Sequence, residues 1–122
     1  MTNEEKINFL KENDVDVETG IENMMDIETY NDILNDFYDS FKEELAKIDN
    51  FKNLSDMPNY AILVHALKSN ARSFGFNRLG EIAYDHEMKS KQGDISYINE
   101  HYNELVSEAN RVYDVITKYK NL

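Results

Sequence analysis

The apolar residues of the chain recur at three- and four-residue steps, the spacing that places side chains on one face of an α-helix. Three long segments show this spacing, at residues 26–49, 58–74 and 95–120, and a shorter one begins near Asn77 and ends at Gly93. No stretch alternates apolar and polar residues as a half-buried strand would. The pattern therefore predicts an all-α protein with four main helices.

Residues with strong positional preferences stand at the ends of these segments. Asp26, Asn77 and Asp94 can each cap the N-terminus of a helix, and Asp56 or Ser55 can cap the segment that begins near Pro58. Pro58 stands in the first turn of its segment, where its missing N–H costs nothing, and Gly75 can supply a left-handed C-terminal residue. Because the links are short, we expect an antiparallel up-down-up-down four-helix bundle.

The beginning of the chain is less regular. A short helix is predicted at about residues 3–12, followed at 15–25 by an irregular stretch with one helical turn at 21–25. The short N-terminal helix would cover one end of the bundle. We therefore expect a single domain over residues 1–122, with 1–25 as a lead-in and 26–120 as the bundle.

The charge of the chain argues against polyanionic partners. Its 122 residues include 13 basic and 24 acidic side chains, a net charge of −11, and residues 1–57 hold 16 of the acids and only 5 of the bases. Nucleic acids and anionic membranes both favour clustered Lys and Arg, so neither is expected as a partner. The polar N-terminus, the absence of cysteine and the lack of a long apolar run favour a cytoplasmic protein.

One polar helix face carries the candidate chemistry. His65, Lys68, Ser69 and Arg72 follow at i, i+3, i+4 and i+7, so they share a face that is distinct from the core face. A lone exposed histidine is usually only a surface residue, but this one has a cation one turn away. An unprotonated imidazole is a nucleophile near neutral pH, and a nearby cation stabilises a transferred phosphoryl group. The face therefore suits phosphoryl transfer, and the Lys68 side chain is expected to be exposed on it.

Several stretches of the chain resemble histidine-containing phosphotransfer (HPt) domains, over about residues 15–120. They are His65-x-x-Lys68 with Phe74-Gly75 behind it, the lead-in Asp16–Phe37, and Ala83–Glu87 followed by Gly93-Asp94. The order and the spacing of these stretches carry the resemblance.

The resemblance implies that His65 accepts a phosphoryl group from a receiver aspartyl phosphate or a kinase and passes it to a response regulator receiver. Lys68 would lie near the phosphoryl group, and Glu87 would hydrogen-bond the imidazole and orient it. Ser69 replaces the glycine common in the family, which makes access slightly tighter. Arg72 is a candidate phosphate or docking contact.

The expected partners are receiver domains and a sensor histidine kinase. The chain lacks a Gly-rich phosphate loop and kinase motifs, so we expect a phosphocarrier without ATP-dependent kinase activity. It would have no cofactor or metal of its own, with Mg²⁺ in the partner receiver, and would be a monomer. Met1 and the largely complete bundle favour a free-standing protein.

The other two histidines are weaker candidates for chemistry than His65. His86 is expected to be a partly buried packing residue and His101 a surface residue, whereas Ile62 is either an exposed docking contact or buried at the bundle seam.

A helical adaptor that is never phosphorylated is the main alternative function, and it predicts that His65 is dispensable. A carboxylate-bridged metal enzyme would need Glu-x-x-His motifs, which are absent.

Overall fold

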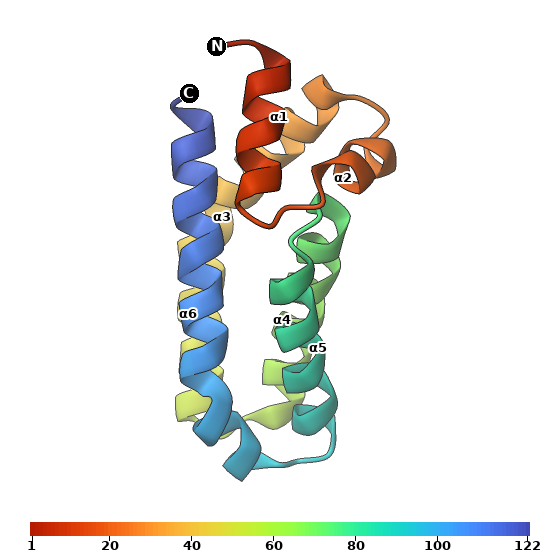
Figure 1. Ribbon diagram of the computed structural model, residues 1–122. Helices are drawn as coiled ribbons and strands as arrows, with labels where there is room; N and C mark the ends of the chain where they lie inside the picture. Colours follow the sequence, from red (N-terminus) through yellow and green to blue (C-terminus); the bar gives the residue numbers. More distant parts are fainter.

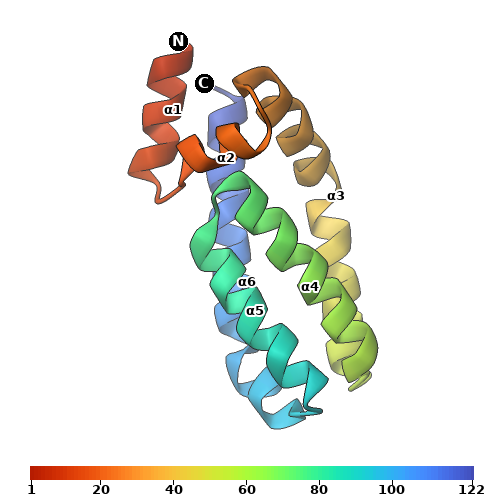
Figure 2. The ribbon, with the colours of Figure 1, turned by 90° about the vertical axis from the view of Figure 1, so that its right-hand side faces the viewer.

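The computed structural model describes all 122 residues and consists of six α-helices without strands. The helices are α1 (Asn3–Glu12), α2 (Val17–Asn23), α3 (Ile27–Asn53), α4 (Met57–Phe74), α5 (Asn77–Lys91) and α6 (Ile95–Lys120). Helices α3 to α6 run alternately up and down, and α1 and α2 lie at the end of the bundle where α6 finishes (Figures 1 and 2). The predicted all-α bundle is confirmed, and none of its helices is both long and apolar enough to cross a bilayer.

The helix caps follow the predictions with one exception. Asp26, Asp56 and Asp94 each accept a hydrogen bond from a backbone N–H in the first turn of α3, α4 and α6, respectively. The prediction that Asn77 caps α5 is wrong, because the capping position is Phe76 and no side chain bonds there. The Phe76 ring is buried in the core, so packing rather than a polar cap sets the start of this helix.

The lead-in contains a second short helix where an irregular stretch was expected. Helix α2 starts after Asp16, whose carboxylate accepts from the first turn, and it lies close against the end of α4. A side chain at Gly20 would have its Cβ 2.6 Å from the backbone oxygen of Phe74, so only glycine permits this approach. The turn expected at 21–25 therefore belongs to a helix that starts and ends earlier.

The core stripe of α4 fixes the direction in which the candidate site points. Tyr60, Val64, Leu67, Ala71 and Phe74 are all buried against the other helices, as predicted. Because the stripe takes up one side of α4, the residues between its members face α3, α5 or solvent. Helix α5 packs more extensively against α4 than any other helix does.

His86 joins three helices within the core. Its side chain is almost fully buried, with Nδ1 2.8 Å from the Tyr60 hydroxyl and Nε2 3.1 Å from the backbone oxygen of His101. A backbone oxygen only accepts, so Nε2 donates and Nδ1 accepts from Tyr60. Burial lowers the pKa of His86, which favours this neutral ring. The predicted packing role is confirmed, while His101 is partly exposed and stacks on Tyr97.

Candidate functional site

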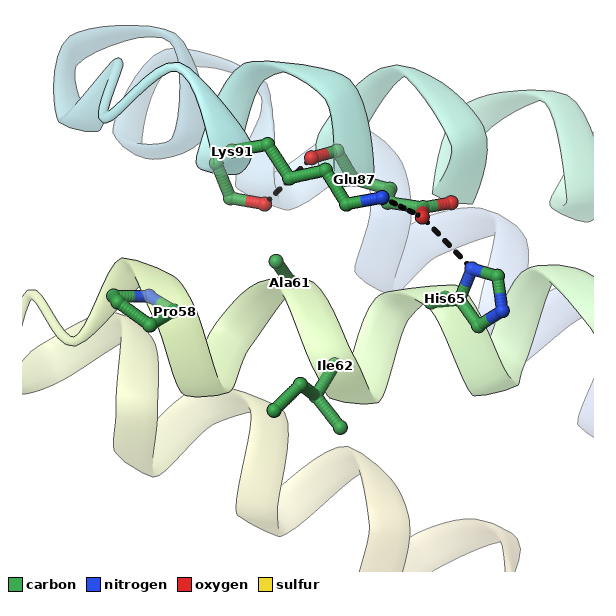
Figure 3. Close-up of a pocket in the computed structure, with 7 residues that line it drawn as sticks. Pro58, Ala61, Ile62, His65, Glu87 and Lys91 are labelled. Carbon is green, nitrogen blue, oxygen red and sulfur yellow. Dashed lines mark hydrogen bonds and ion pairs between the residues drawn. The ribbon is translucent and has the colours of Figure 1, made fainter.

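His65 lies on the exposed side of α4, next to α5. Its side chain keeps 56% of its surface exposed to solvent, although the neighbouring Val64 is fully buried. The ring faces Glu87, which projects from α5 toward α4 (Figure 3). The expected exposure of the imidazole is therefore found, and one edge of the ring is tied to the second helix.

Glu87 is a buried carboxylate held by three donors. Only 3% of its side chain is exposed, and its Oε2 lies 2.7 Å from His65 Nδ1 and 2.7 Å from Lys91 Nζ. Its Oε1 accepts from Lys68 Nζ at 2.6 Å. Figure 3 shows the bonds from His65 and Lys91 converging on this carboxylate. A buried charge is tolerated when it is paired and hydrogen-bonded in this way.

These contacts determine the ionisation of Glu87. Burial raises the pKa of the carboxyl, but the hydrogen bonds from Lys68, Lys91 and His65 outweigh it and lower the pKa to about 2. Glu87 is thus a carboxylate at neutral pH, where it can only accept hydrogen bonds.

The ionised carboxylate fixes the tautomer of the imidazole. Because Glu87 only accepts, Nδ1 of His65 must carry the proton that lies between them. Lys68 Nζ is 3.3 Å from the same Nδ1, but both atoms are then donors, so this is a close approach rather than a hydrogen bond. In the neutral ring the lone pair is left on Nε2, which points away from Glu87 (Figure 3).

Lys68 is less accessible than expected. Its side chain is 14% exposed, because the ammonium group turns inward to Glu87 and lies 5.6 Å from the centre of the Tyr84 ring. The expectation of an exposed lysine is therefore wrong. A carboxylate 19 residues further along the chain, on another helix, accounts for the difference.

The other two predicted residues lie beside this group. Ser69 is exposed one turn beyond His65, so it presents only a small side chain there. The Arg72 guanidinium stacks on the Tyr84 ring, 5.5 Å from its centre, and makes no hydrogen bond to the His65–Glu87 group. The structure thus brings His65, Lys68 and Glu87 together and leaves Arg72 at the margin.

An open groove of about 510 Å³ runs beside the imidazole. It is lined by Pro58, Ala61, Ile62, His65, Glu87, Ser90 and Lys91. Ile62 is 64% exposed, so exposure is the correct one of the two alternatives for this residue. The groove opens to solvent, and Pro58, Ala61 and Ile62 form its apolar side next to His65.

Sequence reasoning did not single out Lys91. It follows Glu87 by four residues on α5, the spacing at which opposite charges pair on a helix, and its side chain is 57% exposed. That spacing was the available signal for Lys91 in the sequence.

Within the chain, no cluster of three or more His, Cys, Asp or Glu side chains could hold a metal ion.

Comparison with models of protein families assigns the chain to a family. The family model described as "Hpt domain" matches residues 32–112, and the chain therefore belongs to the Hpt family. This family implies histidine phosphotransfer within a phosphorelay, in which the domain is a phosphocarrier rather than a kinase and interacts with receiver domains and kinases. Neither the curated proteins nor the solved structures gave a match.

Proposed function

We propose that Nε2 of His65 accepts a phosphoryl group from the aspartyl phosphate of a receiver domain, or from a sensor histidine kinase, and passes it to a response regulator receiver. One observation carries this proposal. The ionised Glu87 holds the ring proton on Nδ1, so the nitrogen that faces outward has its lone pair available. Lys68 and Glu87 are then the residues that assist the reaction.

Phosphoryl transfer to His65 does not require a proton to leave the ring. The Nε2 lone pair of His65 forms a bond to phosphorus, and the phosphorus–oxygen bond of the aspartyl phosphate breaks, so the carboxylate departs with the electron pair. The ring keeps its Nδ1 proton and becomes a cation, which the Glu87 carboxylate stabilises at 2.7 Å. The reverse sequence delivers the group to a second receiver.

The surroundings of His65 suit a protein donor. Ile62, Tyr84 and Met88 are large apolar side chains that remain exposed on α4 and α5, the two helices of the site. An apolar surface around a polar centre is typical of a docking site. The receiver would supply the Mg²⁺ that neutralises the transferred group, and the protein would act as a monomer in the cytoplasm.

The test is incubation with a receiver domain that carries labelled phosphate. The parent protein should acquire acid-labile phosphate, and His65→Gln should acquire none. His101→Gln is the matched control, because His101 is also partly exposed but lies on α6, outside the groove. A parent that binds the receiver without being labelled would favour the adaptor function instead. ATP alone should not label the parent.

A further inference from the structure

Two lysines from different helices share one buried carboxylate. Lys68 on α4 binds Oε1 of Glu87 at 2.6 Å, and Lys91 on α5 binds Oε2 at 2.7 Å. With a neutral His65, these three charged groups sum to one positive charge. One cation would be enough to neutralise Glu87, so the second lysine calls for an explanation.

Lys68 would have to leave Glu87 to reach a phosphoryl group on Nε2, because its Nζ lies on the Nδ1 side of the ring. It is the lysine on the same helix as His65, one turn away, and its Nζ is already 3.3 Å from the ring. Turning from Glu87 toward a phosphoryl group on Nε2 would break its bond to a carboxylate that is 3% exposed. A buried charge that loses its only cationic partner is strongly destabilising, so in the absence of Lys91 the carboxylate of Glu87 would retain Lys68.

The His65 ring does not replace the charge of Lys68 beside Glu87 in the transition state. Phosphoryl transfer passes through a loose transition state in which the bond to the incoming nucleophile is only weakly formed. The His65 ring has therefore gained little positive charge when the phosphoryl group most needs a cation. At that point Lys91 is the remaining full charge on Glu87.

We propose that Lys91 is a positioning residue that keeps Glu87 neutralised, so that Lys68 is released to stabilise the phosphoryl group during transfer. This inference rests on the proposed function of His65. Lys91 is suited to the task because it binds Oε2, the oxygen that also accepts from the ring, and leaves Oε1 to Lys68.

The test is a double-mutant cycle with Glu87→Gln, scored as the single-turnover transfer rate from a saturating phosphorylated receiver. In the parent, Lys91→Met should slow transfer roughly tenfold, because Lys68 stays bound to the buried carboxylate. In the Glu87→Gln background, Lys91→Met should change the rate by less than about twofold, since a neutral amide does not need a cation. Lys91→Arg should keep most of the parent rate.

Equal slowing in both backgrounds would overturn the inference, because Lys91 would then act on the phosphoryl group or the receiver directly. No slowing in the parent, or an Arg variant as slow as the Met variant, would overturn it as well. Lys89→Met is the matched control, since it removes the same charge from α5 and its ammonium lies near Tyr97. In all these outcomes a labelled parent leaves the proposed function intact, whereas an unlabelled parent contradicts that function first.

Discussion

At the scale of single residues, one carboxylate sets the properties of the site. Glu87 is ionised because three donors outweigh its burial, and its charge holds the proton of His65 on Nδ1. On the proposed function, the nitrogen that would attack phosphorus is therefore Nε2, which faces away from Glu87. The same carboxylate holds Lys68 in an inward position, so reactivity and stability depend on the same contacts.

Lys68→Ala should both slow phosphoryl transfer and destabilise the bundle. The lysine would be lost as the cation for the phosphoryl group, and Glu87 would keep Lys91 and His65 but lose its shortest bond. We expect the free energy of unfolding to fall by about 1.5 to 3 kcal/mol, the range for a hydrogen bond to a charged group. Urea unfolding and transfer rates measure the two effects, and unchanged values of both would contradict the structural role given to this lysine.

Glu87 should contribute to stability in a defined pH range. Its pKa is lowered from 4.5 to about 2 in the folded protein, so the unfolded chain binds a proton first as the pH falls. The contribution is therefore complete above pH 4.5 and is lost as the pH falls toward 2. Measured against Glu87→Gln, the parent should be more stable by about 1 to 3 kcal/mol at neutral pH.

The difference in the free energy of unfolding between parent and variant should shrink below pH 4.5. The other carboxylates titrate in both proteins, so their contributions cancel in this difference. A difference that does not change between neutral pH and pH 2.5 would show that Glu87 is not the ionised group described.

The sequence identified which residues lie together but not how they are arranged. His65 and Lys68 share a helix, so their proximity follows from spacing alone. Glu87 came from the family resemblance, because no local rule predicts a partner 22 residues away. The burial of Lys68 and the second bond from Lys91 depend on how α4 and α5 pack, which periodicity does not specify.

At the scale of elements, the end of α4 is held against the lead-in helix. Gly75 has φ +91°, and a Cβ there would clash with the backbone oxygen of Asp16. Gly93, two residues beyond the end of α5, also has a positive φ, of +72°, but nothing lies within 4 Å of the position of its Cβ. The two glycines therefore share a backbone conformation and differ in their surroundings.

Replacing each of these glycines by alanine separates the two effects. Gly93→Ala should cost about 1 kcal/mol, the penalty for a left-handed alanine. Gly75→Ala should cost about 3 kcal/mol or more, because the clash with Asp16 adds to the same penalty. Thermal or urea unfolding measures both, and equal losses would mean that the α2–α4 contact does not constrain Gly75.

The long helices were predictable, and the short one was not. Asp26 and Asp94 combine a polar cap with a long apolar stripe, so local rules agree with the fold. Helix α2 has seven residues and contains Gly20, which disfavours a helix unless a close contact requires it. That contact is with the carbonyl of Phe74, 54 residues away, and so it is a property of the folded protein.

At the scale of the whole molecule, the end of the bundle that α1 covers is separate from the candidate site at His65. Helix α1 covers the end of the bundle beside the C-terminus, and Leu10 is its fully buried anchor (Figure 1). Arg111 on α6 adds a bond to the backbone oxygen of Asn13 at 3.0 Å. His65 lies in the middle of α4, so neither contact touches the groove.

Leu10→Ala should therefore reduce stability without changing transfer. Removing a fully buried leucine side chain typically costs about 2 to 5 kcal/mol. The transfer rate per folded molecule should stay at the parent value, as measured at a temperature where both proteins are folded. A slower rate in the folded variant would mean that α1 influences the His65 face.

The most direct test of the account is to identify the phosphorylated nitrogen. Two-dimensional ¹H–¹⁵N NMR of the ¹⁵N-labelled protein, recorded after transfer from a phosphorylated receiver, distinguishes the two ring nitrogens by their shifts and their coupling to ³¹P. The account predicts that phosphorus is bonded to Nε2 of His65 and that Nδ1 still carries its proton next to Glu87. A bond from phosphorus to Nδ1 would contradict it, as would a ring that stays unmodified while the receiver is dephosphorylated.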